Sequence, residues 1–457
     1  FQTFIMKIKY FLEVCAGCLL FSYVQFYLLS EKQVSSHERG SRILNVFDSP
    51  LESWKEENDT SIREMNTLAN PFYQVDRTDM FVKSAVFDPR IKSAPVVRLL
   101  VLTPMKNTTV YCHVRFGTGS TVVVKAEVII QRVYFESYCK WVTATMKCPL
   151  KTLTIPDQVS VSTSAVDTQS QWHAIRSPQY KPPDMPKYGI CLNKLFNLND
   201  NDVEPLVEWF EMQKILGVHN VIVYGTHNVS RRIHKVLQTY FDSGFVIFRP
   251  WILPFPSYTP TDYKNNPRLK QQDRCVAYHA QHLIYTDCLY RYMDIFTYLA
   301  FIDIDEYIIP AMGETWQDMF KKIESRKKSV IYASYNIPEA CFEKEDDFQE
   351  RGTSGVRLVT KAISRLSEFR MKTGYVPHYK SIVKPQYVDR LYIHDVKAVI
   401  PPMQEKIKLP PSFARLHHYK NPGLCNINST NFREDMYIYK YHDQLVSNMQ
   451  QTLKTIR

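Results

Sequence analysis

The sequence predicts an α/β protein with a mostly parallel sheet, preceded by a small antiparallel β module and an N-terminal transmembrane helix. Three observations lead to this prediction. From Tyr188 onward, strand and helix patterns alternate with short connections, as in a parallel sheet that helices cover on both faces. Over residues 81–150, short strands with alternating apolar residues are separated by Gly, Asn, Pro and Ser, which is typical of antiparallel sheets. The third observation is an apolar run over residues 10–29.

The apolar run is long enough to cross a bilayer as a helix. Lys7 and Lys9 precede it, as expected for a cytoplasmic flank. A cleaved signal peptide has a similar layout, but no small-x-small cleavage site follows Leu29, so a retained signal-anchor is favoured. We therefore expect a cytoplasmic tail over residues 1–9 and a lumenal chain after the anchor.

The composition indicates a globular protein rather than a disordered one. Apolar residues make up 45% and charged residues 23% of the chain, which are ordinary values for folded domains. The net charge of +11 raises the possibility of nucleic-acid binding. However, Lys and Arg are scattered and form no nucleic-acid motif, so we expect no nucleic-acid partner.

Cysteines and glycosylation sequons also indicate a lumenal body. The chain after the anchor has an even number of cysteines, compatible with up to four disulfides of undetermined connectivity. They form no CxxC pair, so a zinc site is not expected. These cysteines are Cys112, Cys139, Cys148, Cys191, Cys275, Cys288, Cys341 and Cys425. The predicted N-glycosylation sites are Asn58, Asn107, Asn228 and Asn428.

Changes in composition predict the domain boundaries. A polar and charged stem precedes the β-rich module, and a stretch rich in Ser, Gln and Pro follows it as a linker. The chain ends in an acidic, Tyr-rich tail, interpreted as a peripheral helix. The predicted segments are the stem 30–80, the β module 81–150, the linker 151–187, the α/β domain 188–421 and the tail 422–457.

Within the α/β domain, each element has a local signal. A strand, GICLNKLF, leads to a helix capped near Asp202 that Gly217 ends. The strand NVIVYG comes next, followed by a helix from Ser230. The strand FVIFRPW precedes a long helix predicted over residues 272–292. A final strand is predicted over residues 297–310, TYLAFIDIDEYIIP.

Two carboxylates in that final strand point to a metal site. With a strand period of two, Asp303 and Asp305 project from the same face. They would repel each other unless a cation lay between them, and hard divalent cations bind carboxylates together with phosphate oxygens. Open α/β sheets bind ligands at this carboxyl end of their strands. The pair therefore predicts a Mn²⁺ or Mg²⁺ site for a nucleotide-sugar diphosphate, the alternative being a solvated acidic turn.

Several segments, in order, resemble glycosyltransferase family 92 (a former domain of unknown function 23) over residues 188–421. They read ICLNKLF, EWFEMQKILGVHNVIVYGT, YHAQHLIYTDCLYRY, FIDIDEYIIP, HYKSIVKP, IHDV and LHHYKN. The resemblance implies a GT-A-like nucleotide-sugar transferase domain in a single-pass type II Golgi membrane protein. It also implies inverting transfer of galactose from UDP-galactose, usually with manganese, to a glycan acceptor such as N-glycan core fucose.

Inversion by single displacement needs a general base, usually Asp or Glu. Glu339 and Glu343 follow a predicted strand end and are the candidates. Family position favours His394 and His418 as further metal ligands, although a lone histidine is more often structural. The candidates for donor binding are Tyr224, Gly225, Asp287 and Lys380.

Three alternatives remain open at this point. The enzyme could use another UDP-sugar, because pocket shape decides the donor. A glycosidase would need two carboxylates that flank a sugar, which suits Asp303 and Asp305 less well than a shared metal does. An inactive, lectin-like protein would bind glycans through the β module. The acceptor and the oligomeric state are not determined by the sequence.

Overall fold

The computed structural model describes residues 72–456 with gaps. The chain divides into two compact units, residues 1–59 and 60–457, and every described residue belongs to the second. Among the described residues, no helix is long and apolar enough to cross a membrane; the expected anchor, residues 10–29, lies outside them. The gaps are residues 105–108, 132–138, 167–170, 180–182, 260–274, 327–330, 344–355, 357, 362–365, 368–378, 402–405, 422–431, 434 and 436.

Parallel strands form one half of the sheet in the α/β domain. Their order is β14-β12-β10-β17, and every neighbouring pair is parallel. They are β10 (Tyr188–Leu192), β12 (Asn220–Val223), β14 (Val246–Phe248) and β17 (Tyr298–Phe301). The carboxyl ends of these strands therefore meet at one edge of the sheet.

The other half of the sheet is mixed, which corrects the prediction of a mostly parallel sheet. From β17 the order continues β21-β19-β20-β26, with antiparallel neighbours throughout. Parallel neighbours need a long crossover, and no described α-helix separates β19, β20 and β21 along the chain. These strands are β19 (Ser334–Glu343), β20 (Leu366–Ser367), β21 (Tyr379–Val383) and β26 (Phe432–Arg433). Two further strands, β24 (Ile407–Lys408) and β25 (Ala414–Lys420), lie parallel to β19.

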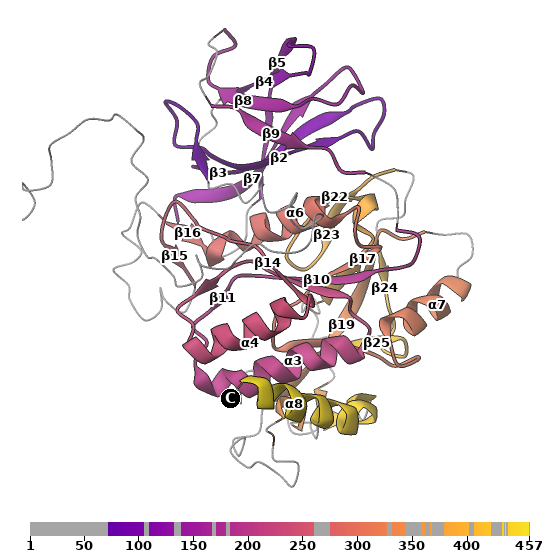
Figure 1. The fold of residues 1–457 in the computed structure, drawn as a ribbon. Coiled ribbons are helices and arrows are strands. Elements are labelled where there is room, and N and C mark those ends of the chain that lie inside the picture. The colour runs from indigo at the N-terminus through magenta and orange to yellow at the C-terminus, as the bar shows by residue number, and fades with distance from the viewer. Residues whose placement is uncertain are drawn as a thin grey trace, which may run out of the picture. The chain divides into compact units, whose positions relative to one another are not determined.

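Helices cover both faces of the parallel strands (Figure 1). Side chains of β10 alternate between the faces: Ile190 packs into the core of α3 and α4, and Cys191 into the core of α6. The local signals are confirmed, because Ser230 Oγ accepts the Ile233 N–H at the start of α4 and Gly217 follows α3 with φ 82°. The helices are α3 (Val203–Ile215), α4 (Arg231–Asp242), α6 (Gln281–Tyr292), α7 (Trp316–Arg326) and α8 (His442–Ile456).

Helix α8 belongs to the domain core rather than to a separate tail. It packs against α3 and α4, and Leu445 and Met449 are buried in the same core as those helices. Thr452 Oγ1 donates to Glu211 Oε1 of α3 at 3.0 Å. The final segment of the chain thus completes the α3 and α4 layer.

The β module is larger than predicted. Residues 151–187, predicted as a linker, contribute β8 and β9, which pair with β4 and β2 of the module; their polar residues had suggested a solvated chain. The strands are β1 (Tyr73–Gln74), β2 (Phe81–Asp88), β3 (Val96–Pro104), β4 (Tyr111–Arg115), β5 (Thr121–Lys125), β6 (Glu127–Gln131), β7 (Trp141–Pro149), β8 (Gln158–Ser162) and β9 (His173–Arg176).

Two strands of the α/β domain extend the sheet of the module. They are β15 (Ser257–Tyr258) and β16 (Val276–Ala277), and β16 lies parallel to β7. The predicted helix over residues 272–292 is therefore corrected: α6 begins only at Gln281, because β16 and a tight turn precede it.

Disulfides are present, as the cysteine count predicted. Cys112–Cys148 lies within the module, Cys191–Cys288 joins β10 to α6, and Cys139–Cys275 joins the module to the segment before α6. Cys341 is also disulfide-bonded, to a partner outside the described residues. Cys191–Cys288 thus attaches α6 to the sheet of the α/β domain, and Cys139–Cys275 attaches the segment before α6 to the β module.

A buried ion network joins the module to the α/β domain. Asp88 Oδ1 lies 2.8 Å from Arg90 Nε, and Asp88 Oδ2 lies 2.7 Å from Arg98 Nε. Arg90 Nη1 also donates to the carbonyl oxygens of Pro385, Gln386 and Val388, and Arg98 pairs with Asp389. Burial opposes ionisation of Asp88, yet the two arginines hold the pKa of its carboxyl well below the usual range. Asp88 is therefore compensated within the module, whereas Arg90 and Arg98 are also compensated by groups of the α/β domain.

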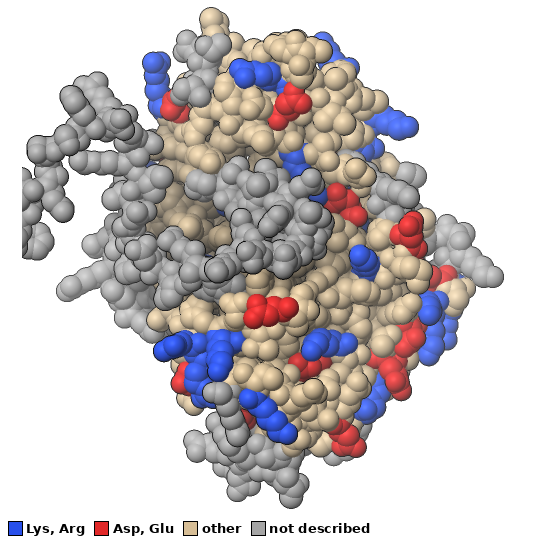
Figure 2. Space-filling model, in the orientation of Figure 1, with Lys and Arg blue, Asp and Glu red and all other residues tan. Residues whose placement is uncertain are grey.

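Surface charges are mixed on the face drawn in Figure 2. Basic and acidic side chains of the described residues are interspersed over that face. The described basic side chains on that face are therefore interrupted by acidic ones.

We predict that Asp88→Ala lowers the free energy of unfolding by about 3–5 kcal/mol, because it leaves the buried Arg90 without a carboxylate partner and removes one of the two carboxylates that pair with Arg98. Urea denaturation of the purified protein measures this change. The control is Asp200→Ala, which removes an exposed pair with Arg232 at 3.9 Å and is expected to cost at most about 1 kcal/mol. Equal losses in the two variants would contradict the stabilising role of the buried network.

Candidate active site

The acidic pair lies on a turn rather than within a strand. Strand β17 ends at Phe301, and the Glu306 N–H donates to the Asp303 carbonyl at 3.1 Å where β18 (Glu306–Pro310) begins. This corrects the single strand predicted over residues 297–310. The chain turns here because β17 pairs with β10 and β21, whereas β18 pairs with β25. The side chains of Asp303 and Asp305 remain 41% and 39% exposed, beyond the carboxyl end of β17.

Lys380 holds the first carboxylate of the turn. Its Nζ atom lies 2.8 Å from Asp303 Oδ2 and 3.1 Å from Glu306 Oε2. The side chains of Lys380 and Glu306 are 3% and 2% exposed, so this ion pair is shielded from water. Burial opposes the charge on Lys380, but Asp303 and Glu306 raise its pKa well above the usual value. Burial also raises the pKa of Glu306 to about 7, against the lowering effect of Lys380.

His418 holds the second carboxylate. Its Nε2 atom lies 3.3 Å from Asp305 Oδ2, and its Nδ1 atom lies 2.9 Å from Glu339 Oε1 and 3.4 Å from Glu306 Oε1. Burial disfavours the imidazolium, but the hydrogen bonds to Asp305 and Glu339 and the charge of Glu306 raise the pKa of His418 to about 10. These residues form what we call the carboxylate cluster: Asp303, Asp305, Glu306 and Glu339 with Lys380, His418 and Lys420.

Glu339 is a member of the carboxylate cluster with a buried side chain and two cationic partners. Lys420 Nζ is 2.8 Å from Glu339 Oε1, the same oxygen that faces His418. Burial opposes ionisation of Glu339, but the hydrogen bonds from His418 and Lys420 lower its pKa to about 2. In this arrangement Glu339 orients His418 and is a weak proton acceptor. Its role as general base stays a prediction.

Sequence reasoning missed two members of the carboxylate cluster. Glu306 directly follows the acidic pair, and Lys420 lies two residues beyond His418 on β25, so strand periodicity could have placed Lys420 on the same face. The signal for Glu306 was weaker, because an acidic residue after an acidic turn is usually solvated.

Of the remaining candidates, His394 is not brought into the cluster, and the side chain of Glu343 is not described. His394 is exposed on the turn between β22 (Val388–Leu391) and β23 (Val396–Val399), beside Asp395, which accepts from Asn336 Nδ2 at 3.2 Å. Glu343 is the last residue of β19, and its side chain lies outside the described part of the structure. Their metal-binding and catalytic roles stay predictions.

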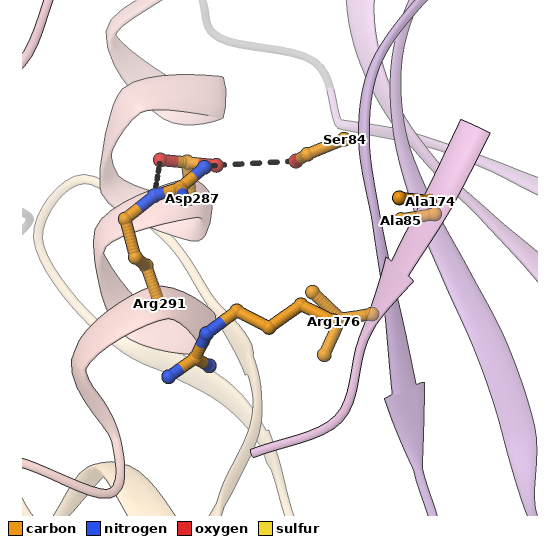
Figure 3. A pocket seen from close by; sticks show the side chains of 7 residues that line it. Ser84, Ala85, Ala174, Arg176, Asp287 and Arg291 are labelled. Carbon is orange, nitrogen blue, oxygen red and sulfur yellow. Dashed lines mark hydrogen bonds and ion pairs between the residues drawn. The ribbon is translucent and has the colours of Figure 1, made fainter. Parts of the chain in front are cut away.

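Tyr224 and Asp287 come together inside the protein. Asp287 pairs with Arg291 and accepts from Tyr224 Oη at 2.7 Å and from Ser84 Oγ of the β module at 3.1 Å. Figure 3 shows Asp287 and Arg291 beside a cavity of about 20 Å³, which is room for one water molecule. The cavity is lined by Ser84, Ala85, Val86, Ala174, Arg176, Asp287 and Arg291. Through these contacts Asp287 links α6 to Ser84 of the β module and to Tyr224. Donor binding by the side chains of Tyr224 and Asp287 stays a prediction.

Gly225 lies where the parallel strands end. It has φ 70°, and its carbonyl accepts the Leu195 N–H at 3.1 Å. A Cβ atom at this position would lie 3.4 Å from the Trp251 nitrogen. Lys194 Nζ donates to the Trp251 carbonyl at 3.3 Å. The segments that follow β10, β12 and β14 therefore meet at the edge of the sheet where such folds bind ligands.

One predicted glycosylation site can be placed. Asn228 is exposed between β13 (Thr226–His227) and α4, and its Nδ2 atom donates to Asn197 Oδ1 at 2.9 Å. Asn58, Asn107 and Asn428 lie outside the described residues. Exposure of Asn228 is compatible with modification.

Comparison with known proteins assigns the family. The sequence model of glycosyltransferase family 92 matches residues 187–455, which is more than half of the chain. The chain therefore belongs to glycosyltransferase family 92.

Two relatives from Caenorhabditis elegans illustrate the similarity. Glycosyltransferase family 92 protein F13G3.3 is 24% identical over 79% of this chain and 66% of its own length. Beta-1,4-galactosyltransferase galt-1 is 25% identical over 52% of this chain and 49% of its own length. The chain thus matches just under two thirds of the first relative and about half of the second.

We predict that Lys380→Met lowers the free energy of unfolding by about 3–5 kcal/mol at neutral pH, because it removes the nearer of the two cations, Lys380 and His418, that face the buried Glu306. Lys384→Met is the matched control: its partner Glu324 is 48% exposed, so a loss of at most about 1 kcal/mol is expected. Chemical denaturation measures both. Similar losses would show that Lys380 does not stabilise the turn.

Proposed function

We propose that the chain is a metal-dependent inverting glycosyltransferase that transfers galactose from UDP-galactose to a glycan acceptor, N-glycan core fucose or a similar group. The observation that carries this proposal is the pair Asp303 and Asp305, which is exposed at the carboxyl end of a parallel strand and held by Lys380 and His418. A GT-A-like domain is consistent with the parallel strands that lead to this turn.

The acidic pair has the chemistry that a hard divalent cation requires. Mn²⁺ and Mg²⁺ bind carboxylate oxygens, and one or two carboxylates suffice where substrate phosphates complete the coordination. Among the described residues, no three His, Cys, Asp or Glu side chains are grouped around one point for a metal ion. We therefore assign Asp303 and Asp305 as the protein ligands, with His418 beside Asp305 as a further candidate. When bound, the metal supplies positive charge to the donor diphosphate.

The cations of the carboxylate cluster keep the acidic pair in place. Lys380 reaches Asp303 from β21, and His418 reaches Asp305 from β25. Because both partners are mostly buried, they restrict the carboxylates more than solvated ions would. A preorganised pair would bind a divalent cation at a lower entropic cost.

The acceptor hydroxyl must lose its proton during inversion. Glu339 and Glu343 are the proposed bases, and Glu339 would accept a proton only after His418 or Lys420 moved away from its carboxylate. The donor sugar is proposed from the name of one relative, beta-1,4-galactosyltransferase galt-1. Attachment to the Golgi membrane by a type II signal-anchor rests on the apolar run of residues 10–29, and the disulfides agree with a lumenal site.

We predict that Asp303→Ala/Asp305→Ala abolishes Mn²⁺-dependent turnover, and that EDTA does the same to the unchanged protein. Donor hydrolysis and transfer to a fucosylated N-glycan measure activity. Asp443→Ala, at a fully exposed position (105%), is the control and should keep full activity. Turnover that survives both EDTA and the double substitution would contradict the assignment of the metal ligands.

We also predict that UDP-galactose is the preferred donor in a panel with the glucose, N-acetylglucosamine and xylose analogues. The value of kcat/KM for each donor is measured on the same acceptor. Preference for another UDP-sugar would overturn the galactose proposal and leave the transferase proposal in place. A well-folded protein that turns over no donor would favour the lectin-like alternative.

A further inference from the structure

A strained turn precedes helix α6. Tyr278, His279 and Ala280 have φ values of 50°, 55° and 58°, so consecutive residues with side chains adopt the left-handed conformation. Each such residue costs roughly 1–2 kcal/mol relative to right-handed backbone. Backbone of this kind persists only where the surrounding structure fixes it, and it is frequent at ligand sites. Contacts with the surrounding structure must therefore fix this turn, and its conformation suggests a role in ligand binding.

The turn lies at the ligand edge of the parallel strands. Trp251, which follows β14, donates its Nε1–H to the His279 carbonyl at 3.0 Å. The ring of Phe196, which follows β10, lies 4.8 Å from the His279 ring. On the first turns of α6, Tyr285 packs 5.1 Å from Phe301 at the end of β17. Segments that follow or end three parallel strands therefore border the turn.

Tyr278 is the member of the turn that a ligand can reach. His279 and Ala280 are buried, at 4% and 1% exposure, whereas Tyr278 is partly exposed. Burial is the main cause that raises the pKa of Tyr278, and the charges of Asp303 and Asp305 raise it further. The Tyr278 side chain is therefore the part of the turn that can offer a hydrogen-bond donor to a ligand at this edge of the sheet.

The β module holds the turn in place. Val276 of β16 pairs with Trp141 of β7, and the Cys139–Cys275 disulfide lies immediately before that pairing. The His279 N–H donates to Ser257 Oγ on the neighbouring β15 at 2.6 Å. These contacts fix the backbone on the amino-terminal side of the turn, and α6 fixes the other side.

We propose that Tyr278 binds the diphosphate of the nucleotide-sugar donor through its hydroxyl, and that the β module acts as a clamp that positions the Tyr278–Ala280 turn through β16 and the Cys139–Cys275 disulfide. This inference rests on the proposed function. It gives the module a role in donor binding and assigns Tyr278 as a substrate-contacting residue. It also accounts for the strained backbone beside the acidic pair.

Binding of UDP to the purified full chain with Mn²⁺, measured by isothermal titration calorimetry, tests the role of Tyr278. Tyr278→Phe should weaken UDP binding by about tenfold and raise the donor KM, since it removes one hydrogen bond to a charged group. Its melting temperature should stay unchanged. Tyr437→Phe, at a 41% exposed position, is the matched control and should bind UDP normally.

The clamp is tested with two cysteine pairs. Cys139→Ser/Cys275→Ser should weaken UDP binding by about tenfold or more, because the left-handed turn relaxes when its anchor is lost. Cys112→Ser/Cys148→Ser removes a disulfide within the module alone and should leave the UDP affinity unchanged while it lowers the melting temperature. Equal UDP affinity in the two pairs would overturn the clamp.

The outcomes separate this inference from the proposed function. If the unchanged protein binds UDP, Asp303→Ala loses that binding and Tyr278→Phe retains it in full, then the role of Tyr278 is overturned and the metal-dependent site stands. If the unchanged protein binds no UDP with Mn²⁺, both proposals fail together. Because Tyr278→Phe deletes one partly exposed hydroxyl, it is expected to fold and decides the question even if the cysteine variants do not.

Discussion

A buried carboxylate, Glu306, imposes the constraint on which the candidate site depends. A charge without water must be compensated by cations and hydrogen bonds. Lys380 from β21 and His418 from β25 supply the positive charge. The Asp303 N–H donates to Glu306 Oε2 at 2.9 Å, so the backbone of the acidic turn is bound to the same group. The buried residues around Glu306 therefore restrict the positions of the exposed Asp303 and Asp305.

The same rule governs the attachment of the β module. Its ions at Asp88, Arg90 and Arg98 are buried and are compensated partly by groups of the α/β domain. Asp287 of α6 likewise accepts from Ser84 of the module while it pairs with Arg291. Helix α6 is thus fixed between two sheets. A module attached in this way belongs to the same framework as the α/β domain.

Much of the fold could be predicted because its signals are local. The end of α3 and the start of α4 depend on single nearby residues: Gly217 adopts a positive φ after α3, and the Ser230 side chain caps α4. The start of α6 could not be predicted in this way. The helical pattern over residues 272–292 has no internal mark that Val276 will pair with Trp141 of the module. Likewise, β8 and β9 are polar enough to resemble a linker, and only their partners make them strands.

For the site, the sequence by itself determined an acidic pair after an apolar strand, and several ordered segments over residues 188–421 indicated the family. Both signals lie in the residues themselves and do not depend on tertiary contacts. Only the tertiary structure decided that Lys380 binds Asp303, 77 residues away, and that His418 binds Glu339, 79 residues away. These contacts depend on strand order and register, which are settled by the whole packed sheet. Local composition does not predict which charged residues, distant in the chain, will share a buried site.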